Sequence, residues 1–504
     1  MLLSKLPGAV KGFVKSNINL FIIKLTLVQT PDSLLASLRA AFSGKLLTDP
    51  LDTAPYLLDW RKRKQGVALA VAEPDNALGV ASVVRWCAAN NVVVVPQGGN
   101  TGLSGGATPE PLEIAVRPAV VISLKKMNKV REMDVVNNTI TVEAGCVLQT
   151  VQEAASQAGR LFPLSLASEG SCTVGGNLST NAGGVNVLRY GNARELCLGL
   201  EVVTASGEIW NGLRGLRKDN TGYDLRDLFI GAEGTLGIIT AAVLKLYPLP
   251  ASRQVAWMSV ESPDKALQLL GLAQAKLGAA LTAFELVSEM AHGLVLKHVP
   301  NSRRPLTDVS PWYVLMEVVD FNNDEACTAA LQAILEAAFE ASLITDAAVS
   351  SSEAQYKAIW ALREDVSEAQ AAEGKNIKHD IAVPVSQIAN FVRETGELVA
   401  AAFPAVRMVT FGHVGDGNLH YNVSPPIDQP HEEFLKNQDA INLIVHDSVA
   451  RFNGSVSAEH GLGTLRRDEA ARYKSKVEMD MMRAVKQALD PHGIMNPNKV
   501  LASG

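Results

Sequence analysis

Cysteine is scarce and scattered in this chain of 504 residues. The five cysteines lie far apart and include no C-x-x-C pair; they are Cys87, Cys146, Cys172, Cys197 and Cys327. An odd, dispersed set argues against a disulfide framework and against a cysteine zinc site. Free thiols persist in reducing compartments, so we expect a cytoplasmic protein.

The sequence also lacks a long apolar run and a long basic run. No stretch approaches the roughly 20 consecutive apolar residues that a membrane-spanning helix needs. The net charge is −6, from 46 basic and 52 acidic residues, so nothing indicates binding to nucleic acid. Hydrophobic residues make up 47% of the chain and charged residues 19%, which is typical of a folded protein with a large core. The length predicts two or more domains.

Acidic residues are absent from residues 1–30, which carry four lysines and the apolar run Leu20–Ile23. A secretory signal is one interpretation of this N-terminal extension. Lys24 interrupts the apolar region, however, and no small-x-small cleavage site follows it. A mis-assigned start and a helix lying on a surface are the alternatives.

The rest of the chain divides by its sequence pattern. Residues 31–65 are predicted to be a helical lead-in that starts at Pro31-Asp32-Ser33. Residues 66–250 alternate β-branched runs with glycine-rich turns, which predicts short strands at 92–95, 139–142 and 200–204 and a helix at 77–89.

Pro248 and Pro250 mark a boundary, after which the pattern changes. Residues 251–475 are predicted to form a second domain with helices at 263–280, 324–342 and 386–403 and strands at 312–319 and 406–411. A C-terminal segment, 476–504, begins with a helix at 476–489. The fold class expected for the whole chain is α+β.

Two glycine-rich segments lie within 66–250, and the first of them directly follows a short strand. The first runs from Val95 to Gly106 and has five glycines in its last nine positions. Such a backbone lets N–H groups converge on an anion, for example a pyrophosphate, although a long hairpin loop is the alternative. The second, Glu169–Gly184, is rich in Gly, Ser, Thr and Asn. Neither has the strand–GxGxxG–helix pattern of a Rossmann NAD site, and neither is a Walker loop.

Together with Arg217–Asp224 and Gly231–Thr240, these two segments resemble the FAD-binding domain of flavoproteins of the vanillyl-alcohol oxidase type. The resemblance covers about residues 66–250 and is specific as a set. It implies that FAD is held between two α+β subdomains, and that a separate substrate or cap domain follows.

The resemblance also implies which residues contact the flavin. In the first segment they are Pro96, Gly98, Gly99, Asn100, Thr101, Gly102 and Leu103. In the second they are Gly170, Ser171, Gly175, Gly176, Thr180, Asn181 and Gly184. Gly237 and Ile239 would lie along the adenine side, and the tail 493–499, with Asn498, would return to the flavin, or simply end a helix. The first segment has no His or Cys that could tether a flavin, and Cys172 is expected to pack in the core, so we infer non-covalent FAD.

Two histidines flank a strong turn sequence near residue 416. His413 and His420 lie on either side of Asp416–Asn418, and a hairpin closed there brings both imidazoles together. Such a pair needs only one more ligand to form a divalent metal site with open positions, and Glu459 is the candidate. The alternative is a set of ordinary core histidines, which is the role expected for His446.

The segments H-V-G-D-G-N-L-H and E-H-G-x-G resemble those of D-2-hydroxyglutarate, D-lactate and glycolate dehydrogenases within this flavoprotein group. The resemblance implies that His413, His420 and Glu459 bind a zinc-like ion and that His460 is the general base. Asn422 would point to the same side of its strand as His420 and contact the substrate. The implied reaction transfers hydride from C2 of a D-2-hydroxy acid to flavin N5, with the metal ion lowering the pKa of the hydroxyl group.

Charge distinguishes the candidate substrates. A second carboxylate needs a second cationic anchor, and the segments 362–369 and 375–380 supply cations and resemble the hydroxyglutarate branch. That resemblance implies that Arg363, Ser367 and Lys378 hold the carboxylates. D-2-hydroxyglutarate is therefore favoured over D-lactate or glycolate, although this chain lacks the aromatic residues that eukaryotic hydroxyglutarate enzymes carry beside the lysine.

The remaining partners follow from the same resemblance. It implies an electron-transfer flavoprotein or a quinone as electron acceptor, and it leaves a homodimer open. Two further interpretations stay open as well. One is a flavin-binding electron-transfer subunit with little activity of its own, and the other is an enzyme that reduces O₂.

Overall fold

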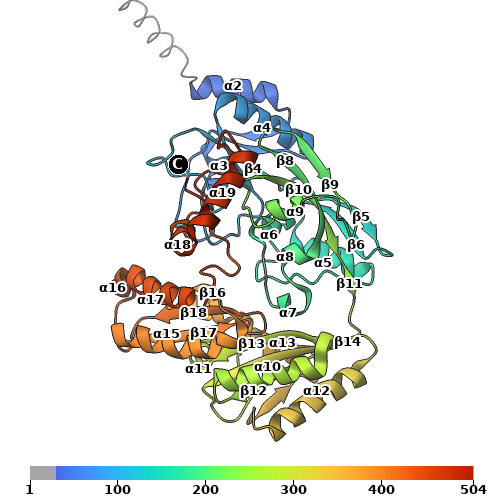
Figure 1. Ribbon diagram of the computed structural model, residues 1–504, viewed down its shortest axis with the longest axis vertical. Coiled ribbons are helices and arrows are strands. Elements are labelled where there is room, and N and C mark those ends of the chain that lie inside the picture. The colour runs from blue at the N-terminus through green and yellow to red at the C-terminus, as the bar shows by residue number, and fades with distance from the viewer. Residues whose placement is uncertain (1–29, 503–504) are drawn as a thin grey trace, which may run out of the picture.

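The computed structural model describes residues 30–502, so the predicted N-terminal extension lies outside the described residues except for Thr30. In the view of Figure 1, the upper half holds two sheets and the lower half holds one large sheet between layers of helices. No helix among the described residues is both long enough and apolar enough to cross a membrane.

The lead-in is only partly helical. Helices α2 (Pro31–Ala41) and α3 (Pro50–Leu57) each begin at a proline that follows a capping side chain. Between them lies strand β1 (Lys45–Leu47), which pairs antiparallel with β2 (Ala70–Glu73). The predicted helical lead-in therefore also contains a strand, whose three residues are too few to show an alternating pattern in the sequence.

The first sheet has the order β1-β2-β4-β3, in which β2, β4 and β3 run parallel. Helix α4 (Ala77–Asn90) connects β2 to β3 (Val93–Gln97), and β4 (Ala119–Ser123) lies between those strands. The first glycine-rich segment leaves the carboxyl end of β3. In open parallel sheets, ligands bind beyond this end of the strands.

The second sheet is antiparallel and has the order β5-β6-β10-β8-β9. Its strands are β5 (Val130–Asp134), β6 (Thr139–Glu143), β8 (Cys197–Thr204), β9 (Ile209–Gly212) and β10 (Gly237–Lys245). The helices around it are α5 (Leu148–Gln157), α6 (Val174–Thr180), α7 (Val187–Tyr190), α8 (Ala193–Leu196) and α9 (Leu225–Phe229). A two-stranded sheet, β7 (Arg160–Leu161) with β11 (Tyr247–Pro248), lies where the chain leaves for the lower half. The two main sheets share one apolar core.

The large sheet of the lower half has seven strands in the order β15-β12-β14-β13-β17-β18-β16. They are β12 (Ser252–Val260), β13 (Leu281–Ser288), β14 (Trp312–Asp320), β15 (Ala347–Val349), β16 (Asp380–Ala382), β17 (Arg407–Gly412) and β18 (Asn418–Ser424). Alternate residues of the central strands β12, β14 and β13 face two different cores, as the strand period of two requires.

Helices cover both faces of this sheet. One core contains side chains of α10 (Pro263–Leu277), α12 (Asp324–Glu340), α15 (Ile388–Ala402) and α17 (Gln438–Arg451). The other contains those of α11 (Glu289–His298), α13 (Glu353–Glu364) and α14 (Val366–Glu373). Helix α16 (His431–Phe434) and the short 3-10 turns 278–280, 385–387 and 435–437 complete this half.

The C-terminal segment returns to the first sheet. Helices α18 (Arg467–Tyr473) and α19 (Lys476–Leu489) follow the lower half of the chain in sequence, and α19 lies in the upper half of Figure 1, where its residues line one cavity with residues of β3 and β4. Beyond α19, the backbone N–H of Val94 donates to Ile494 (2.8 Å), and the N–H of Asn496 donates to Val94 (2.8 Å). The tail thus extends the first sheet alongside β3.

Candidate active site

The hairpin of β17 and β18 positions the two histidines. Phe411 and His420 pair across the strands, and His413 follows the end of β17. The turn between the strands uses the predicted residues, because Gly417 has a φ of 95° and the side chain of Asp416 accepts from the N–H of Asn418 (3.1 Å). The ring centroids of His413 and His420 are 5.7 Å apart, so the hairpin brings the pair together.

Glu459 completes a cluster with these histidines. One potential ligand atom from each of His413, His420 and Glu459 lies within 4.8 Å of the other two, and residues 30–502 contain one such group. Nε2 of His413 lies 3.7 Å from Oε1 of Glu459. Two imidazoles and a carboxylate form a donor set that fits a divalent ion and leaves positions open for a substrate.

The first glycine-rich segment and α6 line one cavity together with the start of β10. The lining includes most of the predicted flavin contacts, namely Pro96, Gly98, Gly99, Asn100, Thr101, Gly102, Gly175, Gly176, Thr180, Gly237 and Ile239. His460 lies at the same cavity. The cavity therefore reaches His460, whose ring centre lies 6.3 Å from that of His420 in the metal cluster.

Close contacts and unpaired polar groups in this cavity fit a dinucleotide. A Cβ on Gly98 would lie 2.2 Å from Oγ1 of Thr173, whereas one on Gly102 would meet nothing within 4 Å and would project into free space. Buried Oε1 of Gln97, Oγ1 of Thr173 and Nδ2 of Asn177 have no hydrogen-bond partner in the described part of the chain. Buried polar atoms of this kind are ordinarily satisfied, so their clustering at one cavity indicates a polar ligand.

Comparison with known proteins decides the family. Residues 68–212 match the model of an FAD binding domain, and residues 249–500 match that of the FAD linked oxidases, C-terminal domain. A D-2-hydroxyglutarate dehydrogenase of Xanthomonas citri pv. viticola is 39% identical over 94% of this chain and 97% of its own length. A mitochondrial D-2-hydroxyglutarate dehydrogenase of Danio rerio is 39% identical over 93% of this chain and 85% of its own.

The chain belongs to the D-2-hydroxyglutarate dehydrogenase family of FAD-linked oxidases.

Solved structures of more distant proteins share the fold of this family. A p-cresol methylhydroxylase with substrate bound gives a TM-score of 0.73 at 16% identity and covers 94% of this chain and 97% of its own. The 4-ethylphenol oxidase of Gulosibacter chungangensis gives 0.69 at 19% identity over 93% and 97%. The predicted α+β fold of the vanillyl-alcohol oxidase type, with an FAD-binding domain, is thereby confirmed.

Several predicted contacts of the second glycine-rich segment do not line the flavin cavity. Gly170, Ser171, Asn181 and Gly184 lie outside its lining, because the segment is not a loop throughout but contains α6. Asn181 caps α6 with a φ of 52°, and a Cβ on Gly184 would lie 2.0 Å from the carbonyl oxygen of Ser165. The carbonyl oxygen of Ser171 lies against Gly99. Of these four residues, Ser171 therefore supports the cavity wall through Gly99.

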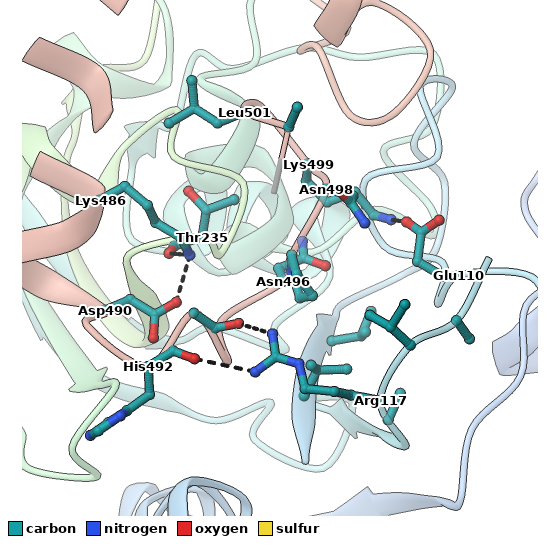
Figure 2. A pocket seen from close by; sticks show the side chains of 18 of the residues that line it. Glu110, Arg117, Thr235, Lys486, Asp490, His492, Asn496, Asn498, Lys499 and Leu501 are labelled. Atoms are coloured by element: carbon teal, nitrogen blue, oxygen red, sulfur yellow. Dashed lines mark hydrogen bonds and ion pairs between the residues drawn. The ribbon is translucent and has the colours of Figure 1, made fainter. Parts of the chain in front are cut away.

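The C-terminal tail contacts the first glycine-rich segment through a different residue from the one predicted. Asn498 lines a separate cavity between the C-terminal segment and the first sheet, shown in Figure 2. It is Asn496 whose Nδ2 donates to the carbonyl oxygens of Gly106 (2.9 Å) and Glu233 (2.7 Å). Lys499, the next residue after Asn498, lines the same cavity and is paired with Glu110 at 2.7 Å. The tail supports the glycine-rich segment through Asn496.

His460, the predicted base of this family member, is held by a carboxylate that the sequence analysis did not single out. Nδ1 of His460 lies 3.0 Å from Oδ2 of Asp380. The same oxygen accepts the backbone N–H groups of Glu459 (3.0 Å) and His460 (3.1 Å). Burial opposes the charge on Asp380, but His460 and His420 outweigh it and hold the pKa of that carboxyl well below its usual range.

A second buried carboxylate, Glu285 on β13, stands behind the metal cluster. Its two oxygens lie 2.8 Å from Nδ1 of His413 and 2.7 Å from Nε of Arg363. Burial disfavours the charged form of His413, yet the carboxylates of Glu285 and Glu459 outweigh it and raise the pKa of His413 to about 9. An acid inside the apolar strand Leu281–Ser288 is the signal that could have revealed Glu285 from sequence.

A cavity of about 690 Å³ opens beside His460. The predicted substrate residues Ser367, Lys378 and Asn422 line it, as does Leu103, which was predicted to contact the flavin. Burial, and then the charges of two arginines, lower the pKa of Lys378 to about 8. The amide of Asn422 is partly engaged, because it donates to Gln370 (2.8 Å).

Arg363 does not line this cavity, in contrast to its predicted contact with substrate. Glu285 draws its guanidinium to one side, and the guanidinium lies 4.8 Å from the ring centre of Phe411, which does line the cavity. Nη2 of Arg363 is buried and has no hydrogen-bond partner among residues 30–502. Arg363 therefore lies behind the cavity wall in this structure.

Proposed function

We propose that the protein oxidises D-2-hydroxyglutarate to 2-oxoglutarate, with non-covalent FAD and a divalent metal ion, zinc by its donor set. The observation that carries the proposal is the position of the His413–His420–Glu459 cluster and His460. His460 lines both the cavity of the glycine-rich segments and the cavity that contains Lys378, and His420 of the metal cluster lines the second of these. The relatives that bear this activity in their names support the substrate.

FAD and the metal ion each have a defined place in this proposal. Residues of the glycine-rich segments and α6 would hold FAD, and His413, His420 and Glu459 would hold the metal ion. When bound, FAD supplies a hydride acceptor, and the metal ion supplies positive charge that lowers the pKa of a coordinated hydroxyl group.

The residues of the chain carry the remaining steps. His460 removes the proton of the C2 hydroxyl group through Nε2, since Asp380 already holds Nδ1. The substrate thereby loses one proton and one hydride and becomes the 2-oxo acid. Lys378, whose ammonium group has no hydrogen-bond partner within residues 30–502, binds a carboxylate. Phe411 and Leu103 add apolar surface to the cavity that would take the substrate.

A substrate panel under argon tests the proposal. D-2-Hydroxyglutarate is expected to bleach the flavin absorbance of the purified holoenzyme, and L-2-hydroxyglutarate is not. Bleaching by D-lactate or glycolate but not by D-2-hydroxyglutarate would reassign the substrate. A failure of every D-2-hydroxy acid would favour a flavin-binding subunit without dehydrogenase activity and would reject the proposal.

We further propose that the electron acceptor is an electron-transfer flavoprotein or a quinone and that the enzyme acts in the cytoplasm. The flavin cavity lies beside a substrate cavity, and neither glycine-rich segment has the pattern of an NAD site. The five cysteines are free and buried, which agrees with a reducing compartment. The yield of hydrogen peroxide during turnover distinguishes O₂ as acceptor, and sedimentation tests the homodimer.

A further inference from the structure

A short loop of the lead-in faces the substrate cavity from the side of the FAD-binding domain. Asp59 is buried and accepts three backbone N–H groups of this loop, those of Arg61 (3.2 Å), Arg63 (2.7 Å) and Lys64 (2.5 Å). The N–H of Asp59 in turn donates to the carbonyl oxygen of Lys64 (3.0 Å). The loop 59–64 is therefore fixed by its own backbone and presents its side chains in set directions.

Contacts on both sides tie this loop to the active site. Nδ2 of Asn100, in the first glycine-rich segment, donates to the carbonyl oxygen of Leu58 (2.9 Å). Nζ of Lys64 donates to Oγ1 of Thr464, four residues beyond His460 (3.0 Å). The loop is thus held between the flavin segment and the segment that carries the base.

The loop adds positive charge to a cavity that already holds Lys378. The side chains of Arg61 and Arg63 line this cavity, and neither they nor Lys378 make a side-chain hydrogen bond or ion pair with another described residue. Two further cations of the lining have partners of their own. Arg466 donates to Glu469 (3.0 Å) and to the carbonyl oxygen of Lys378 (3.1 Å), and Lys375 is paired with Glu432.

The acids that line the cavity leave this charge unbalanced. Asp380 is occupied by His460, Glu469 is occupied by His446 and Arg466, and Asp439 is exposed to solvent. Like charges this close are unfavourable unless an anion lies between them. A monocarboxylic acid at the metal cluster would leave Arg61, Arg63 and Lys378 unpaired, whereas a dicarboxylic acid would bring a second carboxylate to these cations.

We propose that Arg61 binds the substrate carboxylate that lies farther from the reacting carbon, together with Lys378, so that the lead-in segment selects dicarboxylic 2-hydroxy acids. Arg61 is the half-buried arginine of the loop, whereas Arg63 is exposed and adds only positive charge at the cavity. A guanidinium group suits planar, two-point binding of a carboxylate. This inference rests on the proposed function and names a specificity residue for it.

The experiment compares Arg61→Gln with Lys62→Gln, which changes an exposed cation of the same loop that does not line the cavity. Binding of 2-oxoglutarate and of pyruvate to the oxidised holoenzyme is measured by calorimetry, and kcat/KM is measured for D-2-hydroxyglutarate and D-lactate. Arg61→Gln is expected to weaken 2-oxoglutarate binding and to lower kcat/KM for D-2-hydroxyglutarate by about 10–100-fold. Pyruvate binding and D-lactate turnover should change by less than about 3-fold, and Lys62→Gln should match the wild type.

The outcomes separate this inference from the proposed function. A wild-type enzyme that D-2-hydroxyglutarate does not reduce would defeat the proposed function before any variant is made. With that activity present, equal losses for the mono- and dicarboxylic acids, or no loss for either, would overturn the role of Arg61. If Arg61→Gln does not fold, Arg61→Lys keeps the charge but not the two-point geometry and should still weaken 2-oxoglutarate binding several-fold more than pyruvate binding.

Discussion

Asp380 holds His460 through one oxygen, Oδ2, which lies 3.0 Å from the imidazole Nδ1 and 3.1 Å from the backbone nitrogen of the same residue. This contact fixes both the position of the ring and the nitrogen that carries a proton, so Nε2 is left free to act as the base. The carboxylate also stabilises the imidazolium that forms when the base takes a proton.

Replacing Asp380 with Asn should therefore lower kcat more than it changes KM. An amide keeps the shape but loses the charge, and we expect a loss of about 10–100-fold in kcat. Steady-state kinetics on flavin-replete enzyme measure this. Asp439→Asn, which changes an exposed acid lining the same cavity, is the control and should behave as the wild type. Wild-type kcat in Asp380→Asn would show that Asp380 has no part in orienting the base.

Removal of the metal ion should abolish turnover while most of the flavin stays bound. The predicted ligands, His413 among them, lie apart from the residues that line most of the flavin cavity. Dialysis against a chelator, followed by metal analysis and by the flavin spectrum, checks this.

Glu285→Gln should lower metal affinity by about 10–100-fold, since Glu285 orients the ring of His413.

The exposed His492 provides the control for the metal experiment. His492→Ala should keep the full metal content, because this imidazole lies on the surface and lines only the separate cavity of Figure 2. Full activity of the metal-free wild-type enzyme would contradict a role for the metal ion.

Local patterns were sufficient to predict the parts of the site that one short segment builds. The Asp416–Asn418 turn sets the register that pairs Phe411 with His420, and the predicted final helix 476–489 is α19. Both depend on neighbouring residues in the sequence, where periodicity and turn chemistry act.

The missed groups come from distant segments. Glu285 meets His413 across 128 positions of the chain, and Asp380 meets His460 across 80. The apolar strand around Glu285 marks that acid as unusual. For both acids, however, the histidine partner appears only when the sheet brings distant segments together, so no local pattern could assign the pairs. The positions of Arg61 and Arg363 also depend on contacts between distant segments, since Glu285 holds the guanidinium of Arg363 away from the cavity.

Lys378→Ala should raise KM for D-2-hydroxyglutarate far more than for D-lactate. Loss of a half-buried cation that lines the cavity removes a charge-assisted bond to the second carboxylate, which is worth about 10-fold or more in binding. Steady-state kinetics with both acids measure the difference. Lys375→Ala serves as the control, because Lys375 is exposed and already paired with Glu432. Equal effects of Lys378→Ala on both substrates would exclude the assignment of a diacid.

Two alanine substitutions in the first glycine-rich segment should separate folding from flavin binding. A Cβ on Gly99 would lie 2.1 Å from the carbonyl oxygen of Ser171, so Gly99→Ala should destabilise the apoprotein by about 1–3 kcal/mol. A Cβ on Gly102 meets nothing within 4 Å, so Gly102→Ala should leave apoprotein stability unchanged but weaken FAD binding. Thermal unfolding of the apoproteins and FAD titration check both. Wild-type FAD affinity in Gly102→Ala would argue against close approach of the flavin there.

Glu233 should make stability depend on pH. It is buried beside the flavin cavity, and its carboxylate accepts the N–H groups of Leu462 (2.7 Å) and Gly463 (2.9 Å). Burial outweighs these bonds and raises the pKa of Glu233 to about 7 from an ordinary 4.5. Between those two values the folded protein binds more protons than the unfolded chain. The free energy of unfolding therefore falls as pH rises through this window, by up to about 3 kcal/mol.

Glu233→Gln should remove this part of the pH dependence, because the amide cannot ionise. The measurement is urea unfolding of the holoprotein between pH 4.5 and pH 8, with Glu340→Gln as an exposed control. The wild type and the control should lose stability towards pH 7 relative to Glu233→Gln. If the free energy of unfolding changes with pH in the same way in all three proteins, Glu233 is charged throughout this pH range. The N–H groups of Leu462 and Gly463 then bind it as a carboxylate rather than as a protonated acid.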